Sequence, residues 1–241
     1  PKGVIEKVMD RTNRLVRPAV ANVETALITF GCTNPEPDFL LLDRILIQIM
    51  AQKIKPVICF NKTDLVSAER AAEICAPYEN AGFHVVTVSA HTGEGIDALK
   101  SVLAGKISIF AGPSGVGKSS LINAFGLGYE LETGILSKKT ERGRHTTRRV
   151  ELLSLGNDTF IADTPGFSAL NLPPEISSEN LCDFYPEFAE AAKYCPYGGC
   201  MHVKERDCEV KNDVQDGTID RGRYERYCIF LEELKEREKK Y

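Results

Sequence analysis

The sequence lacks the features of exported, membrane-spanning and repeat proteins. It contains no tryptophan, no internal repeat and no low-complexity tract. No apolar run approaches the ~20 residues that a membrane-spanning helix needs. The N-terminal residues include Lys2, Glu6 and Lys7 where a secretory signal would have an apolar segment. The composition is that of a soluble globular protein, which we expect in the cytoplasm and without a membrane partner.

A large excess of one charge is also absent. The net charge is −4, which argues against a surface that wraps nucleic acid without specificity. Eight cysteines are present. Because there is no secretory signal, we expect a reducing compartment, where clustered cysteines bind metal more often than they form disulfides.

Residues 112–120, GPSGVGKSS, match the phosphate-binding pattern G-x-x-x-x-G-K-[ST]. An apolar run precedes them and a helical pattern follows, which is the strand–loop–helix setting that this motif requires. Backbone N–H groups of such a loop surround phosphate oxygens at a helix N-terminus. We expect Lys118 to place charge at the β- and γ-phosphates and Ser119 to ligate Mg²⁺. The residues assigned to the phosphates are Gly112, Pro113, Ser114, Gly115, Val116, Gly117, Lys118, Ser119 and Ser120.

Apolar runs of strand length alternate with helical patterns along the chain. This alternation predicts an α/β fold with a mostly parallel sheet covered by helices on both faces. Ligands of such sheets bind at the carboxyl ends of the strands. We expect strands at 25–30, 57–60, 84–88, 107–111, 150–155 and 159–162, and helices at 39–53, 67–81, 95–103, 120–125 and 221–240. Ser67 is the expected N-cap of the second helix. In the last helix, one face is expected to carry Tyr224, Cys228, Leu231 and Leu234.

The segment NKTD matches the guanine-recognition pattern N-K-x-D. A carboxylate at Asp64 can accept from N1–H and the N2 amine of guanine, and adenine offers neither donor there. Ser89 and Ala90 follow the next strand, where the Ala90 N–H would meet guanine O6. The residues assigned to the base are Asn61, Lys62, Thr63, Asp64, Ser89 and Ala90.

The segment DTPG follows the last predicted strand. Asp163 would reach Mg²⁺ through a water molecule, and the Gly166 N–H would face the γ-phosphate. A second protein hydroxyl for Mg²⁺ would come from Thr146 or Thr147, of which we favour Thr147.

The order of these motifs is unusual. In ordinary GTPases the P-loop comes first, followed by the switch threonine, DxxG, NKxD and SA. Here NKTD and Ser89-Ala90 precede the P-loop, which indicates a circular permutation. The permutation places DTPG directly before the C-terminal residues, so a movement at Gly166 would pull on them.

The C-terminal part carries a candidate metal site with the spacing C-x₄-C-x-H-x₅-C. Three cysteines and one histidine form a closed tetrahedral set that is typical of one structural zinc ion. A short segment with few large apolar residues would need such a cross-link. Ordinary buried thiols beside a surface histidine are the alternative. The candidate ligands are Cys195, Cys200, His202 and Cys208; the packing cysteines are Cys32, Cys59, Cys75, Cys182 and Cys228.

This motif order, with GPSGVGKSSLIN, a GRHTT segment and a cysteine-rich C-terminal part, closely resembles the ribosome small-subunit-dependent GTPase A family over essentially the whole chain. The resemblance implies an OB-fold, a permuted GTPase and a zinc-binding domain. It also implies GTP hydrolysis stimulated by the 30S subunit and a role in late 30S maturation, with GTP, GDP and 16S rRNA as partners. We expect a monomer in which residues 1–20 are a remnant of the OB-fold and linker, 21–172 the GTPase domain and 173–241 a helical zinc-binding domain.

The catalytic group is less obvious. Many GTPases have a glutamine directly after DxxG, but this sequence has Phe167, which cannot orient a water molecule. Beyond the charge of Lys118, His145 is the leading substitute, and the resemblance supports it; a solvated histidine is the alternative. The surrounding segment 137–149 has six Lys/Arg and one Glu, and either contacts rRNA phosphates or is a solvated face.

Three classes of function fit these motifs. The first is a GTP hydrolase that acts on the small ribosomal subunit. The second is a GTP-dependent binding switch, in which hydrolysis only triggers release. The third is a zinc-containing RNA-binding protein with a vestigial nucleotide site, which the intact Lys118, Ser119, Asp163 and Asp64 argue against.

Overall fold

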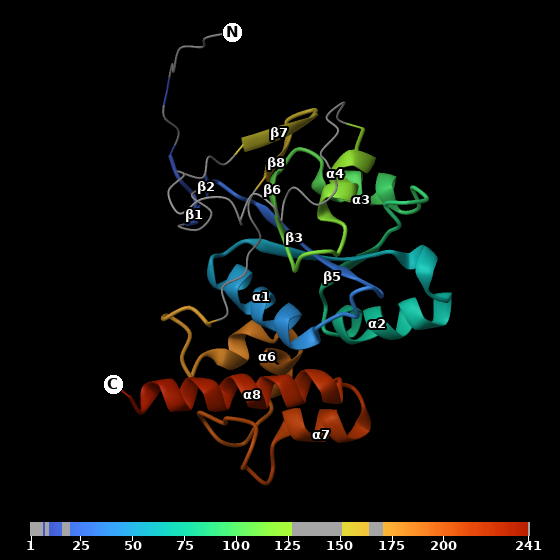
Figure 1. The fold of residues 1–241 in the computed structure, drawn as a ribbon. Coiled ribbons are helices and arrows are strands. Elements are labelled where there is room, and N and C mark those ends of the chain that lie inside the picture. Colours follow the sequence, from blue (N-terminus) through green and yellow to red (C-terminus); the bar gives the residue numbers. More distant parts are fainter. Residues whose placement is uncertain (1–6, 8–9, 16–19, 127–150, 164–170, 241) are drawn as a thin grey trace.

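A six-stranded sheet lies at the centre of the molecule (Figure 1). The computed structural model describes residues 7, 10–15, 20–126, 151–163 and 171–240. The strand order is β5-β4-β3-β6-β8-β7, with neighbours parallel except β7, which runs antiparallel to β8. The strands are β3 (Thr25–Gly31), β4 (Lys55–Asn61), β5 (His84–Thr87), β6 (Ile107–Ala111), β7 (Glu151–Gly156) and β8 (Thr159–Asp163). The predicted α/β sheet is confirmed.

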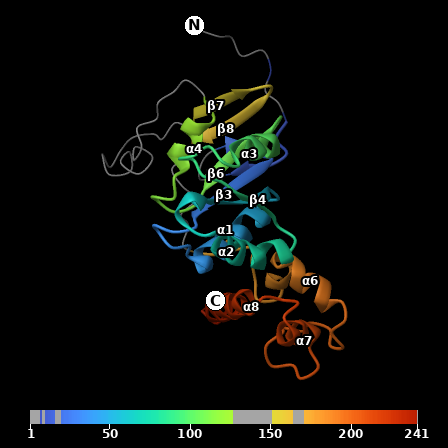
Figure 2. The ribbon, with the colours of Figure 1, turned by 90° about the vertical axis from the view of Figure 1, so that its right-hand side faces the viewer.

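Helices cover both faces of this sheet. One face packs on α1 (Phe39–Ala51) and α2 (Ala68–Asn80), and the other packs on α3 (Ile96–Leu103) and α4 (Lys118–Ala124). Figure 2 shows these layers edge-on, with the C-terminal helices beyond α1 and α2. Every residue of β3 is buried, because this strand lies inside the sheet with helices above and below it.

Local sequence explains where these elements begin and turn. The Asp38 side chain accepts from the Leu41 N–H (3.0 Å) and caps α1, and Ser67 caps α2 as predicted, accepting from the Arg70 N–H at 3.3 Å. Between β7 and β8, Asn157 and Asp158 both have positive φ, at 47° and 55°. Two such residues form the tight turn that suits a hairpin.

The C-terminal helices form a second layer against α1. They are η2 (Leu181–Phe184), α6 (Pro186–Ala192), α7 (Glu209–Asp216) and α8 (Arg221–Glu238). Their apolar core includes Tyr185, Phe188, Tyr227 and Phe230, and Ile47 of α1 joins it. The expectation of few large apolar residues here is wrong, because these four rings are at most 1% exposed.

The buried face of α8 also differs from the predicted one. Tyr224 and Cys228 lie at its margin and are only half-buried. The fully buried positions of the helix are Arg223, Tyr227, Phe230, Leu231 and Leu234. The apolar pattern identified the helix but missed the buried arginine.

Near the N-terminus, β1 (Arg14–Leu15) and β2 (Val20–Ala21) form a two-stranded antiparallel pair. Leu15 is 3% exposed and packs with the core between the sheet and α1–α2. In the described part of the chain, no helix combines the length and apolar character needed to cross a bilayer.

Candidate functional site

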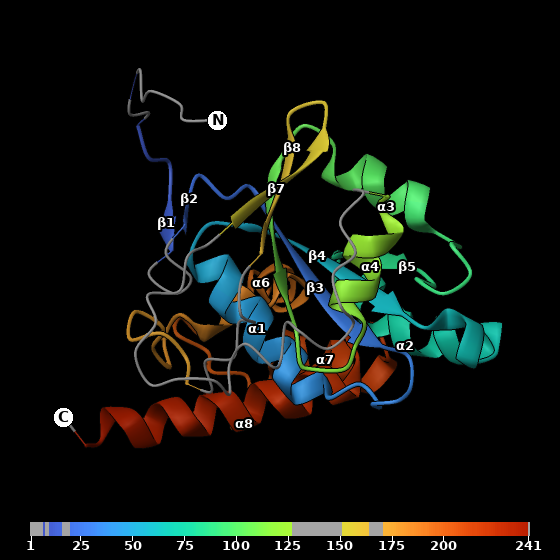
Figure 3. The same cartoon turned by 45° about the horizontal axis from the view of Figure 1, so that its top comes forward.

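Several of the sequence motifs meet at the carboxyl ends of the parallel strands. Asn61 ends β4, Ser89-Ala90 follow β5, and the P-loop joins β6 to α4. Since β5, β4, β3, β6 and β8 are consecutive parallel neighbours, their carboxyl ends lie along one edge of the sheet (Figure 3). Ligands bind at this edge in open α/β sheets.

In the P-loop, Lys118 is positioned by the loop it belongs to. Its Nζ donates to the carbonyl oxygens of Gly112 (2.8 Å) and Pro113 (2.5 Å). Burial disfavours the ammonium form and lowers the pKa of Lys118 to about 8. Ser119 follows at the start of α4 and is 8% exposed. The Lys118 ammonium group and the Ser119 hydroxyl therefore belong to adjacent residues at the N-terminus of α4.

Two glycines permit close approach of the loop to its neighbours. At Gly112, with φ 124°, a Cβ would lie 2.1 Å from the Thr29 carbonyl oxygen in β3. At Gly117, with φ 95°, a Cβ would lie 2.2 Å from the Asn61 amide nitrogen. Any larger residue would clash with a neighbouring strand end. The glycines of the motif thus fit the P-loop against β3 and β4.

Asn61 connects the predicted guanine-binding segments to the P-loop. It is 1% exposed, donates to the Val116 carbonyl (2.9 Å) and accepts from the Ala90 N–H (3.0 Å). The Ala90 N–H that we expect at guanine O6 is therefore engaged with Asn61 in this structure. One buried amide holds three loops in register.

The next residues of NKTD reach the same loops. Lys62, with φ 67°, donates to the carbonyl oxygens of Gly115 (2.8 Å) and Asn34. The exposed Asp64 carboxylate accepts from the Ser89 hydroxyl at 2.6 Å. This contact orients Asp64, whose side chain is exposed at the sheet edge.

The remaining predicted nucleotide-site residues are only partly located. Asp163 is the last residue of β8, next to β6, but its side chain lies outside the described part. His145, Thr147, Gly166 and the basic segment 137–149 also lie outside the described residues. The assignments of these residues to catalysis, Mg²⁺ and the γ-phosphate stay predictions.

The four predicted zinc ligands form a cluster in the C-terminal part. Their ligand atoms all lie within 4.8 Å of one another. The His202 Nδ1 is 3.4 Å from the Cys208 Sγ and 3.7 Å from the Cys195 Sγ, and these two sulfurs are 3.9 Å apart. A tetrahedral zinc site has ligand–ligand edges of about 3.8 Å, given Zn–S bonds of ~2.3 Å. The arrangement can therefore hold a metal ion.

The chemistry of these donors also fits a metal. Burial raises the pKa of Cys208 to about 12, and it lowers the pKa of His202. Without an ion these groups are thiol and neutral imidazole, and a bound cation would convert the thiols to thiolates. Three of these weakly polar groups lie 3.4–3.9 Å apart and gain little from one another, so a cation would supply the missing attraction.

Hydrogen bonds fix the loop that carries the ligands. The Glu205 carboxylate accepts from the N–H groups of Met201, Val203 and Lys204 at 3.0–3.1 Å. Burial opposes the charged form of Glu205, but these bonds outweigh it and lower its pKa. The Tyr224 hydroxyl donates to the His202 carbonyl at 2.8 Å. The ligand loop is thus attached to α8.

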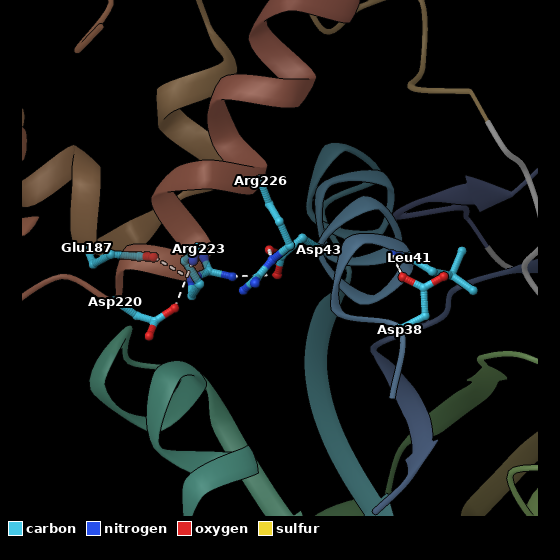
Figure 4. A network of polar contacts seen from close by, with 7 residues as sticks. All are labelled: Asp38, Leu41, Asp43, Glu187, Asp220, Arg223 and Arg226. Atoms are coloured by element: carbon cyan, nitrogen blue, oxygen red, sulfur yellow. Dashed lines mark hydrogen bonds and ion pairs between the residues drawn. The ribbon is translucent and has the colours of Figure 1, made fainter. Parts of the chain in front are cut away.

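A buried ion network joins α8 to α1, one of the helices that cover the sheet (Figure 4). Arg223 donates to Asp43 of α1 (2.7 Å) and to Glu187 of α6 (2.5 Å), and Arg226 donates to the other Asp43 oxygen. Arg223 and Asp43 are each 1% exposed. Burial works to lower the pKa of Arg223, but the two carboxylates outweigh it and raise that pKa. We name these four residues the α1–α8 ion network.

Aromatic rings surround the same cation. The Arg223 guanidinium carbon lies 4.7 Å from the Tyr185 ring centre, 5.2 Å from Tyr78 and 5.3 Å from Phe83. Two carboxylates and three aromatic ring faces thus take the place of the water that would solvate the Arg223 charge at a surface. Nothing in the helical pattern predicted this network, although Asp43 stands out as a lone acid in the otherwise apolar run FLLL-D.

The fold and this sheet edge define a circularly permuted P-loop GTPase. A family model described as RsgA GTPase matches residues 8–173. The chain therefore belongs to the RsgA GTPase family, which confirms the resemblance noted from its motifs, and it is a GTP hydrolase.

Curated relatives and solved structures agree with this placement. A protein of Moorella thermoacetica is 47% identical over 100% of this chain and 82% of its own length. One of Agathobacter rectalis is 46% identical over 98% of this chain and 78% of its own length. Both are named small ribosomal subunit biogenesis GTPase RsgA.

Two crystal structures share the fold. YjeQ from Thermotoga maritima superposes with a TM-score of 0.80 at 35% identity, covering 95% of this chain and 77% of that one. YloQ, described as a circularly permuted GTPase, has a TM-score of 0.77 at 33% identity and covers 96% and 75%. The permutation inferred from motif order is confirmed.

Proposed function

We propose that this chain hydrolyses GTP as a factor in the biogenesis of the small ribosomal subunit, in late 30S maturation. Its relatives carry names that state small-subunit biogenesis, at 46–47% identity over nearly the whole chain. The single observation that carries the nucleotide part is the Asn61 side chain, which ties the P-loop to both guanine-binding segments.

The roles of the residues follow from their chemistry. Asp64, oriented by Ser89, would accept from guanine N1–H and N2, and Lys62 would border the base. When phosphates enter the P-loop, the Lys118 ammonium would exchange two carbonyl oxygens for phosphate oxygens. These anions favour its charged form and would raise its lowered pKa.

Two metal ions fit the donors present. Mg²⁺ would be held by Ser119, with Thr147 and Asp163 as the further protein groups, and would neutralise phosphate charge. Zinc would be held by the Cys₃His set, where it would stabilise the fold of the C-terminal part.

Turnover with and without purified 30S subunits tests this proposal. We expect the subunit to accelerate GTP hydrolysis, because Phe167 stands where many GTPases have the glutamine that orients water. Lys118→Ala should abolish measurable turnover under both conditions. A rate that 30S subunits leave unchanged would contradict the proposed function, and normal turnover by Lys118→Ala would contradict the site.

Base specificity gives a second, independent prediction. Asp64→Asn should shift the preference from GTP towards xanthosine triphosphate, since an amide can donate to the O2 of xanthine. The size of the loss for GTP should be on the order of a hundredfold or more, because guanine N1–H and the N2 amine would lose the carboxylate that accepts from both. Competition binding against a fluorescent nucleotide measures it, with Asp97→Asn on α3 as the control. Unchanged selectivity would refute the role of Asp64.

A GTP-dependent binding switch is the second candidate. Phe167 favours it, because a chain that hydrolyses slowly by itself can stay bound until hydrolysis triggers release. The two candidates differ when a non-hydrolysable GTP analogue is used. A pure switch completes its task with the analogue and only fails to dissociate, whereas a factor that needs hydrolysis leaves the subunit immature.

A further inference from the structure

The loop that carries the metal ligands presents aromatic side chains to solvent. Tyr194 is 77% exposed, Tyr197 is 52% exposed and Val203 is 37% exposed. Within the described part of the chain, six large hydrophobic side chains are exposed, and these three lie within ten residues of one another. Clustered exposed rings on a soluble protein indicate a binding surface more often than isolated ones do.

Hydrogen bonds from α8 and within the loop fix its backbone. Tyr227 and Tyr224 donate to the carbonyl oxygens of Met201 (3.3 Å) and His202 (2.8 Å), and Glu205 accepts from three backbone N–H groups. The Cys₃His set closes the loop at its base. A surface fixed in this way loses little conformational entropy when a ligand binds.

The turn that directly follows Tyr197 is uncovered. A Cβ built on Gly198 or Gly199 would meet no atom within 4 Å. In Figure 1 the loop lies below α8, on the side away from the sheet. A flat ring can therefore approach the exposed Tyr197 and the glycine backbone that follows it.

The charge around the rings suits an anionic partner. Lys193, Lys204 and Arg206 are exposed, against one exposed acid beside them, Asp207. Glu205, between Lys204 and Arg206, has both carboxylate oxygens occupied by backbone N–H groups. Lys193 pairs with Glu190 at 2.7 Å, but both side chains are more than half exposed, so the pair is weak. Among the described residues, Lys204 and Arg206 form no ion pair.

Exposed rings on a rigid support, flanked by cations, are the elements of a stacking surface for single-stranded nucleic acid. We propose that residues 193–206, the tyrosine loop, bind unpaired nucleotides of RNA, with Tyr194 and Tyr197 stacking on bases and Lys204 and Arg206 contacting phosphates. This inference rests on the proposed function, because a ribosomal subunit supplies such RNA. A partner protein that fills the same surface is the rival.

Binding to a fluorescein-labelled, unstructured oligoribonucleotide of about twelve nucleotides tests this, with the metal-loaded full chain and anisotropy as the readout. We expect Tyr194→Ala and Tyr197→Ala each to weaken binding at least fivefold, since stacking contributes ~1–3 kcal/mol per base. The corresponding Tyr→Phe variants keep a ring and should bind within about twofold of the unaltered chain. Ile229→Ala, at a side chain of similar exposure on the outer face of α8, is the matched control and should change nothing.

A spectroscopic signal separates stacking from simple contact. The chain has no tryptophan, so tyrosine emission can be followed directly. RNA should quench part of this emission, and the Tyr194→Phe/Tyr197→Phe double variant should bind RNA with clearly less quenching. A duplex of the same sequence should bind at least tenfold more weakly, because its bases are already stacked.

Metal content and unstimulated GTP turnover should be unchanged in all variants, which shows that they fold. If the alanine variants bind the oligoribonucleotide normally, the tyrosine loop is not the stacking surface. If they bind it normally but lose affinity for 30S subunits, the occupant is a protein. If the loop binds RNA as expected while 30S subunits fail to stimulate turnover, the stacking surface stands and the proposed function falls.

Discussion

In the six-stranded sheet the buried side chains are uncharged and mostly apolar, whereas the C-terminal part buries Arg223 and His202 among four aromatic rings. The sheet is stabilised by apolar burial on both faces and by backbone pairing. The helical part adds directional contacts: an ion network to α1 and a metal-ligand cluster. When one partner of such a network is removed, the remaining buried groups lose their hydrogen-bond or ion-pair partner. The whole network is then destabilised.

The largest expected effect on the difference between the two regions comes from a substitution in the candidate metal site. Cys208→Ser should remove a fully buried ligand and unfold much of the C-terminal part, while the sheet persists. Structural zinc contributes roughly 10–16 kcal/mol in small zinc domains, as much as a whole domain's stability. Circular dichroism should show loss of helix, and affinity for fluorescent GDP should stay within about threefold.

Cys228→Ser is the matched control, at a half-buried cysteine of α8 outside the ligand set. It should keep the metal and the helical signal. A Cys208→Ser chain that retained stoichiometric metal, or that lost nucleotide binding, would show that the two regions do not differ in this way.

Removing the centre of the α1–α8 ion network should have the next largest effect. Asp43→Ala leaves Arg226 without its carboxylate and Arg223 with only Glu187. Breaking a buried pair in this way costs about 3–5 kcal/mol. Urea unfolding measures the loss, and hydrogen exchange should place it first in α8.

The exposed pair between Asp97 and Lys100 on α3 provides the control. Its carboxylate is fully exposed, so Asp97→Ala should leave the unfolding midpoint unchanged. If both substitutions lowered the unfolding midpoint equally, burial would not explain the contribution of the α1–α8 ion network to stability.

The smallest expected effect is the pH dependence of nucleotide binding, which should be confined to the site at the carboxyl ends of the strands. Because burial lowers the pKa of Lys118 to about 8, the free site loses its ammonium charge as the pH rises above that value. Phosphates favour the charged form, so GDP binding should take up a proton above pH ~8. Affinity should then fall by up to about tenfold per pH unit.

Calorimetry in buffers of different ionisation enthalpy measures this proton uptake. Lys118→Arg, whose guanidinium stays charged, should bind GDP with little pH dependence between pH ~8 and ~10. Metal content and the helical signal of the C-terminal part should not change over this range. Proton uptake by the arginine variant would assign the effect to another group.

The sheet could be predicted well from the sequence. Each run of apolar residues became a strand within one or two positions, and Ser67 caps α2 as predicted. Parallel strands buried on both faces have a simple signal, because each must be apolar throughout. The motif positions at strand ends then followed from the sheet itself.

The contacts that hold the site together could not be predicted. Lys62 donates to the backbone carbonyl of Asn34. Because every residue type has this carbonyl group, the identity of residue 34 could not indicate the contact. The use of the Ala90 N–H by Asn61 likewise depends on the distance between two loops. Spacing in the sequence shows which groups are available, and only their positions in space show which of them meet.

The C-terminal helices show the same limit more strongly. Their candidate metal ligands were evident, since the chemistry of Cys and His at short spacing is local. The size of their core was underestimated, because its aromatic residues are scattered over α6, α8 and the segment between the sheet and α6. The pairing of Asp43 with Arg223 joins positions 180 residues apart.

The sequence by itself determined the nucleotide chemistry, the permuted order of the motifs and the metal-ligand set, because each depends on residue types at short spacing. The tertiary structure decided how these parts are joined: Asn61 between three loops, Asp43 between α1 and α8, and the tyrosine loop held outward by α8. Long-range pairing depends on how helices and strands pack, and that geometry has no local signal in the chain.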